Sequence, residues 1–172
     1  MTAVDREEVI RFIEESFKDT PQPSDAELFP QRLDRDPETM DWRREFGDLT
    51  WQELAERMRH LSVCDLNGIG HALWLLTGPA LHYLMPAMLC VGTIDDELDT
   101  EFFPEFLNVI APAPFGKPRL DGHLAAVMTP AQTCAVARTL EYIIERGTDW
   151  EEPREQLTHW RRLCDEDARR AD

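Results

Sequence analysis

The chain has 172 residues, of which 42% are hydrophobic and 30% charged, and its 34 acidic residues against 18 basic ones give a formal net charge of −16. This length suffices for one domain that buries a core without metals or disulfides. The acidic balance argues against nucleic-acid binding, because phosphate contacts need clustered Lys and Arg, and against anionic membrane surfaces. It suits a protein partner with a basic face.

The first predicted helix runs from about Ala3 to Phe17, because apolar residues recur there at helical spacing. The next stretch, about thirty residues from Lys18 to Asp48, has four prolines and no sustained period. We expect a long N-terminal loop there, with one short helical turn at Ala26 to Phe29. A second helix begins after Thr50, since Glu53 completes a T-x-x-E capping box. The sequence Asp65-Leu-Asn-Gly68 predicts a turn that closes it.

A stretch without any charged residue follows, from Leu66 to Ile94. A transmembrane helix needs roughly 20 apolar residues in one run, and glycines, histidines and prolines interrupt this one. We therefore predict two short helices, Ile69 to Leu76 and Pro79 to Val91, the second with Thr77 or Gly78 at its N-cap. The second is apolar nearly all round, which is typical of a buried central helix, and Pro86 should kink it.

Three further helices are predicted toward the C-terminus. An acidic turn leads into a short helix from Phe102 to Ile110. Thr129, Pro130 and Gln132 mark the start of the next helix, and Gly147 marks its end. The last runs from about Asp149 to Asp165. The fold class is all-α: one compact domain over residues 1–172, with five to six helices around the charge-free central helix and a C-terminal helical extension at 148–172.

Two of these stretches resemble a known family. They are "LWLLTGPALHYLMPAMLC" at Leu73–Cys90 and "MTPAQTCAVARTLEYI" at Met128–Ile143. They are similar to small acidic bacterial proteins known only as a domain of unknown function, whose signature is an apolar "F-L-T-P-x-x-F-x-Y-Y-L-P-A-Y-L" segment followed by "L-T-P-x-Q" at a helix start. The chain departs from that pattern at Gly78, Leu81 and His82. The resemblance implies a helical fold in this order of elements, and it implies no activity, cofactor or catalytic residue.

The four cysteines are far apart and form no C-x-x-C pair: Cys64, Cys90, Cys134 and Cys164. Three of them lie among apolar residues, where a free Cys behaves as a small hydrophobe. The N-terminal segment "MTAVDREEVIRF" has no apolar signal-peptide core. We therefore expect a cytoplasmic protein with reduced thiols and no disulfide framework.

The sequence offers few candidates for catalysis or metal binding. His71 and His82, near Asp65, are the best pair, but no H-x-x-x-H or H-E-x-x-H spacing supports a metal site. A buried, hydrogen-bonded His is the more ordinary outcome. The acidic run that starts at Asp95 lacks the Gly and the bidentate Glu of an EF-hand loop. We predict no catalytic residues, no metal and no cofactor.

Two surfaces are predicted to bind a partner. One is an acidic run in a predicted loop, namely Asp95, Asp96, Glu97 and Asp99, with Asp34–Glu38 as a second acidic run. The other is the C-terminal helix with Trp150 and Trp160, since Trp is enriched in interface hot spots. For these two side chains the sequence favours packing onto the domain over a docking or self-association surface.

The favoured hypothesis from the sequence is a non-enzymatic acidic protein that binds a basic protein partner. Its most specific form is an immunity or inhibitor protein that neutralises a basic, nucleic-acid-acting bacterial toxin. Two alternatives stay open: a small enzyme that uses His71 and His82, and a housekeeping scaffold protein.

Overall fold

A computed structural model describes residues 5–94, 102–110, 124, 127–146 and 152–171. The described residues form nine α-helices and one 3-10 helix, with no strand, so the chain is all-α. The elements, in chain order, are α1 (Arg6–Phe17), α2 (Asp25–Leu28), the 3-10 helix η1 (Gln31–Leu33), α3 (Pro37–Phe46), α4 (Trp51–Met58), α5 (Val63–Leu73), α6 (Gly78–Gly92), α7 (Phe102–Ile110), α9 (Pro130–Glu145) and α10 (Glu152–Ala171).

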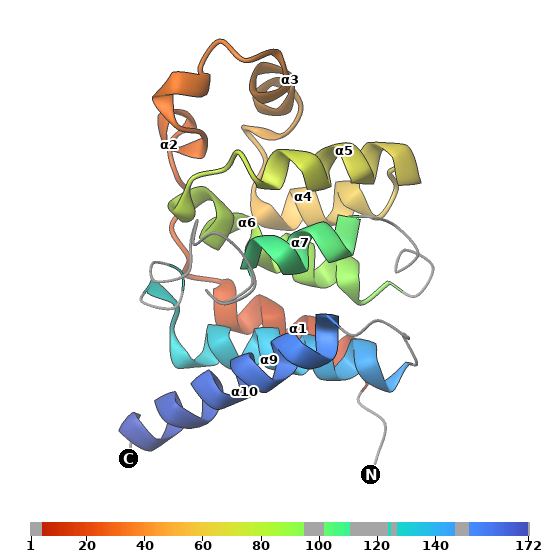
Figure 1. Ribbon diagram of the computed structural model, residues 1–172, viewed down its shortest axis with the longest axis vertical. Coiled ribbons are helices and arrows are strands. Elements are labelled where there is room, and N and C mark those ends of the chain that lie inside the picture. The colour runs from red at the N-terminus through yellow and green to blue at the C-terminus, as the bar shows by residue number, and fades with distance from the viewer. Residues whose placement is uncertain (1–4, 95–101, 111–123, 125–126, 147–151, 172) are drawn as a thin grey trace.

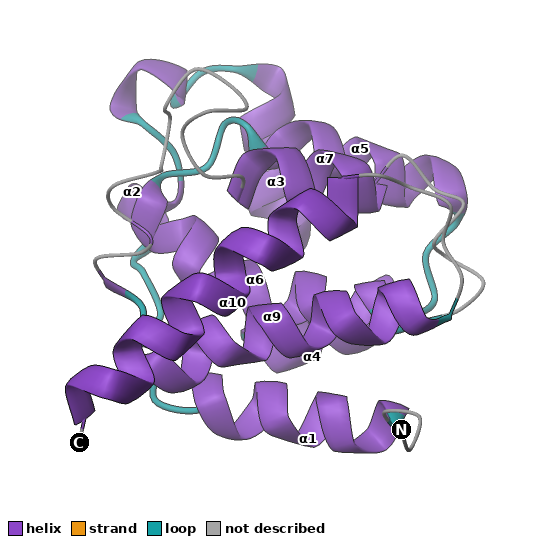
Figure 2. Ribbon diagram, turned by 60° about the horizontal axis from the view of Figure 1, so that its bottom comes forward, coloured by secondary structure: helices purple, strands orange, loops and turns teal. Residues whose placement is uncertain are grey.

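The helices pack in two groups. Helix α9 lies between α1 and α10 at one end of the molecule, as both ribbon views show (Figures 1 and 2). At the other end α5 packs on α7, and α3 packs on α5 (Figure 1). The charge-free helix α6 contacts α1, α2, α4, α7 and α9, and therefore joins the two groups.

Helix α6 is almost entirely buried. Thr77 is its N-cap, as one of the two predicted alternatives has it, and its side chain accepts a hydrogen bond from the Ala80 amide. Twelve of its fifteen residues are buried, including Pro86 inside the helix. This burial explains the absence of charge, because a buried ion would lose its hydration without compensation. None of the helices in the described part of the chain combines the length and apolar composition needed to span a bilayer.

Both predicted capping boxes are present. The Thr50 amide donates to Glu53 Oε2 at 2.8 Å, and the Glu53 amide donates to Thr50 Oγ1 at 3.2 Å. At α9, Thr129 and Gln132 form the same reciprocal pair. Two orphan amides are satisfied in each case, so the sequence fixes the N-terminus of both helices.

The predicted N-terminal loop is partly wrong. The short turn expected at Ala26 to Phe29 is present as α2, but η1 and the ten-residue helix α3 also lie within the stretch. Helix α3 has Asp36 at its N-cap and Pro37 in its first turn, and it buries Trp42 and Phe46. These start signals are standard. The helix was missed because few of its ten residues are apolar.

The predicted turn at Asp65 to Gly68 is also wrong. Ser62 caps α5, which continues through Asn67, Gly68 and Gly70 to Leu73. Such residues disfavour a helix only by about 1 kcal/mol each, which tertiary packing overrides. No helix was predicted in place of α3, and only a turn in place of α2, so the five to six helices predicted around the central one are fewer than the described residues form. The last helix extends beyond its predicted end, to Ala171.

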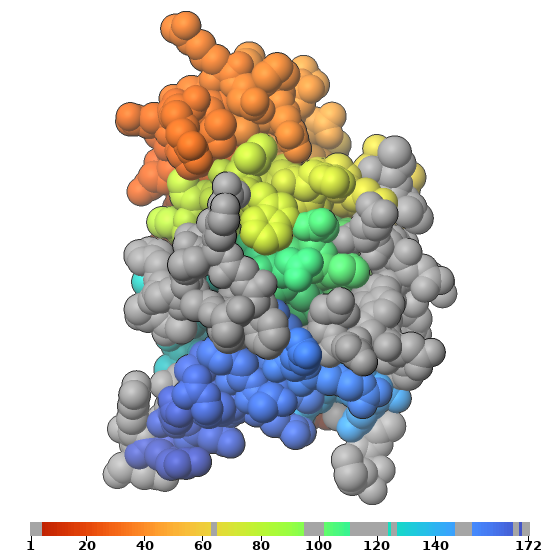
Figure 3. Space-filling model, in the orientation of Figure 1, coloured from red at the N-terminus to blue at the C-terminus, as the bar shows by residue number. Residues whose placement is uncertain are grey.

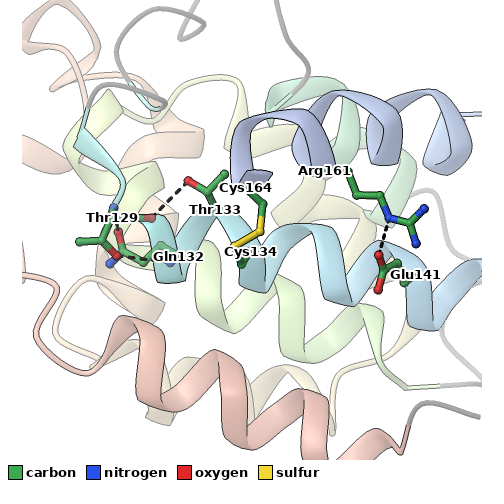
Figure 4. Close-up of a disulfide and its surroundings, with 7 residues drawn as sticks. All are labelled: Thr129, Gln132, Thr133, Cys134, Glu141, Arg161 and Cys164. Carbon is green, nitrogen blue, oxygen red and sulfur yellow. Dashed lines mark hydrogen bonds and ion pairs between the residues drawn. A yellow bond between two sulfur atoms is a disulfide. The ribbon is translucent and has the colours of Figure 1, made fainter. Parts of the chain in front are cut away.

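A disulfide joins the last two helices, contrary to the prediction of reduced thiols. Cys134 on α9 and Cys164 on α10 are bonded, with their Cα atoms 5.0 Å apart (Figure 4). Farther along the same two helices Arg161 Nε donates to Glu141 Oε1 at 2.6 Å (Figure 4). The sequence does not reveal this pairing, because it depends on how α10 lies on α9. Cys90 is free and buried, and burial raises the pKa of its thiol to about 12.

We predict that Leu84→Ala lowers the free energy of unfolding by about 2–5 kcal/mol, as buried large-to-small changes do. Leu84 lies on α6 and is 2% exposed. Urea titration followed by circular dichroism measures the change. A loss below about 0.5 kcal/mol would place this side chain at the surface and contradict the packing of α6.

We also predict that reductant destabilises the protein by about 3–4 kcal/mol, the loop-closure entropy of a cross-link across 30 residues. The double variant Cys134→Ser/Cys164→Ser should show the lower stability in both redox states, whereas Cys90→Ser should keep the response to reductant. Equal urea midpoints for the oxidised and reduced wild type would show that the cross-link contributes nothing to the fold.

Candidate partner-binding groove

The structure describes few of the residues predicted to bind a partner. Asp95, Asp96, Glu97, Asp99 and Trp150 lie outside the described residues. Trp160 is 2% exposed and packs edge-on against the His159 ring, with the centroids 5.7 Å apart. Its ring is therefore buried in the described part of the domain, and a docking role for the C-terminal helix stays a prediction.

The two histidines of the enzyme hypothesis have different surroundings. His71 is exposed on α5. His82 on α6 is half-buried, and its Nε2 lies 3.0 Å from Gln132 Oε1, in the capping box of α9. Gln132 Nε2 in turn donates to Thr20 Oγ1 at 2.9 Å. His82 thus takes part in a polar contact that ties α6 to α9, and no contact between His71 and His82 is found among the described side chains.

A different region has the features of a partner site. The segment from α2 to α3 forms a lobe above α5, seen in orange over the yellow and green helices in Figure 3. The lobe is held together by Arg43, whose Nη2 donates to Asp34 Oδ1 at 2.9 Å and whose guanidinium lies 5.4 Å from the centre of the Phe29 ring. Thr77 ties it to the body, because the Thr77 amide donates to the Leu28 carbonyl at 3.0 Å.

A groove of about 610 Å³ lies where this lobe meets the body, and we name it the α3–α5 groove. Its lining comes from α3, α4, the turn after α4, and α5. The lining residues are Glu38, Asp41, Trp42, Arg44, Glu45, Phe46, Arg57, Leu61, Asp65, Gly68, Ile69 and Ala72.

The apolar residues of the groove belong to the core. Trp42, Phe46 and Ile69 are 4%, 7% and 3% exposed, so they form a firm apolar base and not a set of loose surface side chains. The Trp42 and Phe46 rings are in tilted contact, with centroids 5.4 Å apart. A rigid base of this kind costs little conformational entropy when a partner binds.

At Gly68 the groove has open space, because this lining residue has no side chain. A Cβ atom added to Gly68 would meet no heavy atom within 4 Å. Gly70, two residues on, differs: its added Cβ would lie 3.3 Å from the Cα of Phe102 on α7. The two glycines of α5 therefore have different effects, because Gly70 lets α7 approach closely and Gly68 leaves room at the surface.

The charged residues of the groove give it a negative balance. Four carboxylates and two guanidinium groups line it. Arg44 is already paired with Asp41 at 3.0 Å, and the Arg57 guanidinium lies 5.3 Å from the centre of the Phe46 ring. Glu38 and Glu45 are exposed and carry no ion pair within the described part of the chain. They are available to a cationic partner group.

A second hollow, of about 280 Å³, lies between η1, the end of α5 and α7. Its walls are mostly apolar, and its one charged lining residue is Arg32. On one side Trp74 Nε1 donates to Glu105 Oε2 at 2.5 Å. Because the one charged residue that lines this hollow is Arg32, the hollow does not suit a basic partner.

The groove is next considered as a metal site and as a polar site. Among the described residues no group of three or more His, Cys, Asp or Glu side chains is placed to hold a metal ion. Asp65 accepts a hydrogen bond from Ser62 Oγ at 2.6 Å, in the first turn of α5, and this contact is a helix cap. The arrangement can hold apolar and cationic groups of a partner.

Comparison of the chain with models of protein families, with curated proteins and with solved structures finds no match. The resemblance to the small acidic bacterial family therefore stays a prediction.

We predict that Gly68→Ala raises the free energy of unfolding by about 0.5–1 kcal/mol, because Ala favours the helix and the new methyl group has open space. Gly70→Ala is the matched control on the same helix, and it should lower stability or leave it unchanged, since the rigid backbone of α7 blocks its methyl group. Urea titration of both variants measures the difference. Equal gains at both positions would contradict the close approach of α7 to α5.

Proposed function

We propose that this chain is a non-enzymatic acidic protein that binds a basic protein partner. In the specific form that we favour, it is an immunity or inhibitor protein that masks a basic, nucleic-acid-acting bacterial toxin. The observation that carries the proposal is the α3–α5 groove, where Glu38, Asp41, Glu45 and Asp65 lie beside apolar residues of the core.

Electrostatics supports this proposal over nucleic-acid or membrane binding. A formal charge of −16 on 172 residues attracts a cationic surface at long range and repels phosphate. A protein that acts on nucleic acid needs a cationic face to hold its substrate. An acidic protein that covers that face would compete directly with the substrate, which is how masking inhibits.

Long-range attraction brings the partner close, and the groove adds apolar contacts that can hold it. Charge accelerates association, while well-packed apolar contacts set the lifetime of a complex. Half-buried Leu61, with the small exposed parts of Trp42, Phe46 and Ile69, provides apolar contacts beside the acidic residues of the groove. Apolar contacts beside polar ones are typical of protein–protein interfaces.

The proposed location is the cytoplasm, where a toxin that attacks nucleic acid would have to be met. The Cys134–Cys164 bond is the one observation against it, because structural disulfides are rare in cytosolic proteins. Thiol alkylation of the protein in intact native cells distinguishes the two locations: alkylated Cys134 and Cys164 support the cytoplasm, and a protected pair supports an oxidising compartment.

We predict that the triple variant Glu38→Gln/Asp41→Asn/Glu45→Gln slows association with the natural partner by roughly threefold or more at low salt, because it removes three charges from the rim. The partner is first captured from native cells with the tagged protein and identified by mass spectrometry. Biosensor kinetics between about 50 mM and 500 mM salt then give the on-rates, which should fall with salt as charges are screened.

The matched control is Glu7→Gln/Glu14→Gln/Asp19→Asn. It removes the same charge from exposed residues of α1 and of the turn after it, on a helix that packs against α6 and α9, away from the groove. It should have a smaller effect on the on-rate. An on-rate that does not change with salt, or a partner as acidic as this chain, would contradict the proposed function.

A further inference from the structure

We propose that the α3–α5 groove receives one amphipathic helix of the partner, with an apolar side chain seated over Gly68 and Lys or Arg residues over α3 and the start of α5. This inference rests on the proposed function and names the form that the basic partner takes at the site. It is built from the lining of the groove, its charges and the open space at Gly68.

The backbone of the groove determines which kind of segment can bind. Its walls are the helices α3, α4 and α5, whose amides and carbonyls are already engaged within each helix. An extended peptide would find no strand edge there to pair with its own backbone groups. A helix satisfies its backbone internally and needs only side-chain contacts. A helical segment is therefore the occupant that this groove suits.

The length of the groove gives the spacing of the contacts. On α5 the lining residues run from Asp65 to Ala72, and on α3 from Glu38 to Phe46. Seven residue steps along a helix cover about 10.5 Å, or two turns. A bound helix of similar length presents apolar side chains at positions i, i+3 or i+4, and i+7 on one face.

Open space at Gly68 gives the contact its specificity. Every other apolar lining residue carries a side chain, and Ile69 and Ala72 beside it are 3% and 1% exposed. Only at Gly68 is the base of the groove free of a side chain, with no heavy atom within 4 Å of an added Cβ. An apolar side chain of the partner that fills this space would exclude water from it and from the neighbouring base.

Charge decides what flanks the apolar side chain. Glu38, Glu45 and Asp65 offer carboxylates on two walls of the groove, and all three are exposed. Arg57, stacked on the Phe46 ring, makes the α4 side positive. Cationic residues of the partner therefore belong over α3 and the start of α5. A negatively charged helix would be repelled at both of these walls.

Three synthetic 18-residue peptides, labelled with a fluorophore, test this inference by anisotropy. The first has Leu along one helical stripe and Lys elsewhere; the second has the same composition with Leu spread around the helix; the third replaces every Lys of the first by Glu. We expect the first to bind at least about tenfold more tightly than the second, and the third not to bind. Circular dichroism should show the first peptide gaining helix on binding.

Two substitutions at one position separate the groove from general attraction. Gly68→Phe should weaken binding of the first peptide by about tenfold or more, because the ring occupies the open space. Gly68→Ala, which adds one methyl group, should weaken it much less. Unchanged helix content, with a thermal midpoint no lower than that of the wild type in either variant, shows that the fold is intact, as the open space at Gly68 predicts.

The outcomes distinguish this inference from the proposed function. Equal binding of the first two peptides, or tight binding to Gly68→Phe, would overturn the seated helix. If the natural partner still binds with a salt-dependent on-rate in that case, the proposed function stands and the partner uses another surface or another shape. Absence of binding by all three peptides would also overturn the inference.

Discussion

Burial of helix α6 is the constraint on which the rest of this structure depends. The helix carries no charged residue and is apolar on nearly every side, so it is stable only when other helices cover it. Helices α1, α2, α4, α7 and α9 do so. Helix α7 contacts α6 closely at Gly92, where an added Cβ would lie 2.2 Å from the Phe103 ring. The last turn of α6 therefore depends on glycine to admit α7.

Covering α6 uses the apolar faces of the surrounding helices and leaves their charged faces toward solvent. Helix α1 shows the division, because Val9, Ile13 and Phe17 are buried while Glu7 and Glu14 are exposed. Among the residues whose exposure the structure describes, no Asp, Glu, Lys or Arg is buried, so their charge lies at the surface. The α3–α5 groove is the place where this acidic surface meets an apolar base, and that combination makes it the best supported binding site.

Much of the fold could be predicted from local signals. The boxes at Thr50 and Thr129 gave helix starts that the structure confirms, and the cap at Thr77 was among the predicted alternatives. These signals are short-range hydrogen bonds, so neighbouring residues suffice to recognise them. The turn expected at Asp65 to Gly68 was wrong because the same residues sit in a helix once α7 packs beside Gly70.

The site was harder to predict, because it is made of residues distant in sequence. Glu38 lies in the predicted acidic run from Asp34, but Asp36 caps α3 and Asp34 pairs with Arg43, so only part of that run is free to bind. Nothing local shows that Trp42 and Gly68 line one groove. The Cys134–Cys164 bond was missed for the same reason, since it follows from the packing of α10 on α9.

The most direct test of the account is a nuclear magnetic resonance titration of the ¹⁵N-labelled protein with the Leu-striped Lys peptide. The amide of Gly68 is a sensitive probe, because glycine amides resonate in a separate region of the spectrum and this one lies at the open base of the groove. We expect the Gly68 and Ile69 amides and the Trp42 indole N–H to shift first and to saturate together. Shifts confined to α1, α9 and α10, with the Gly68 amide unchanged, would contradict it.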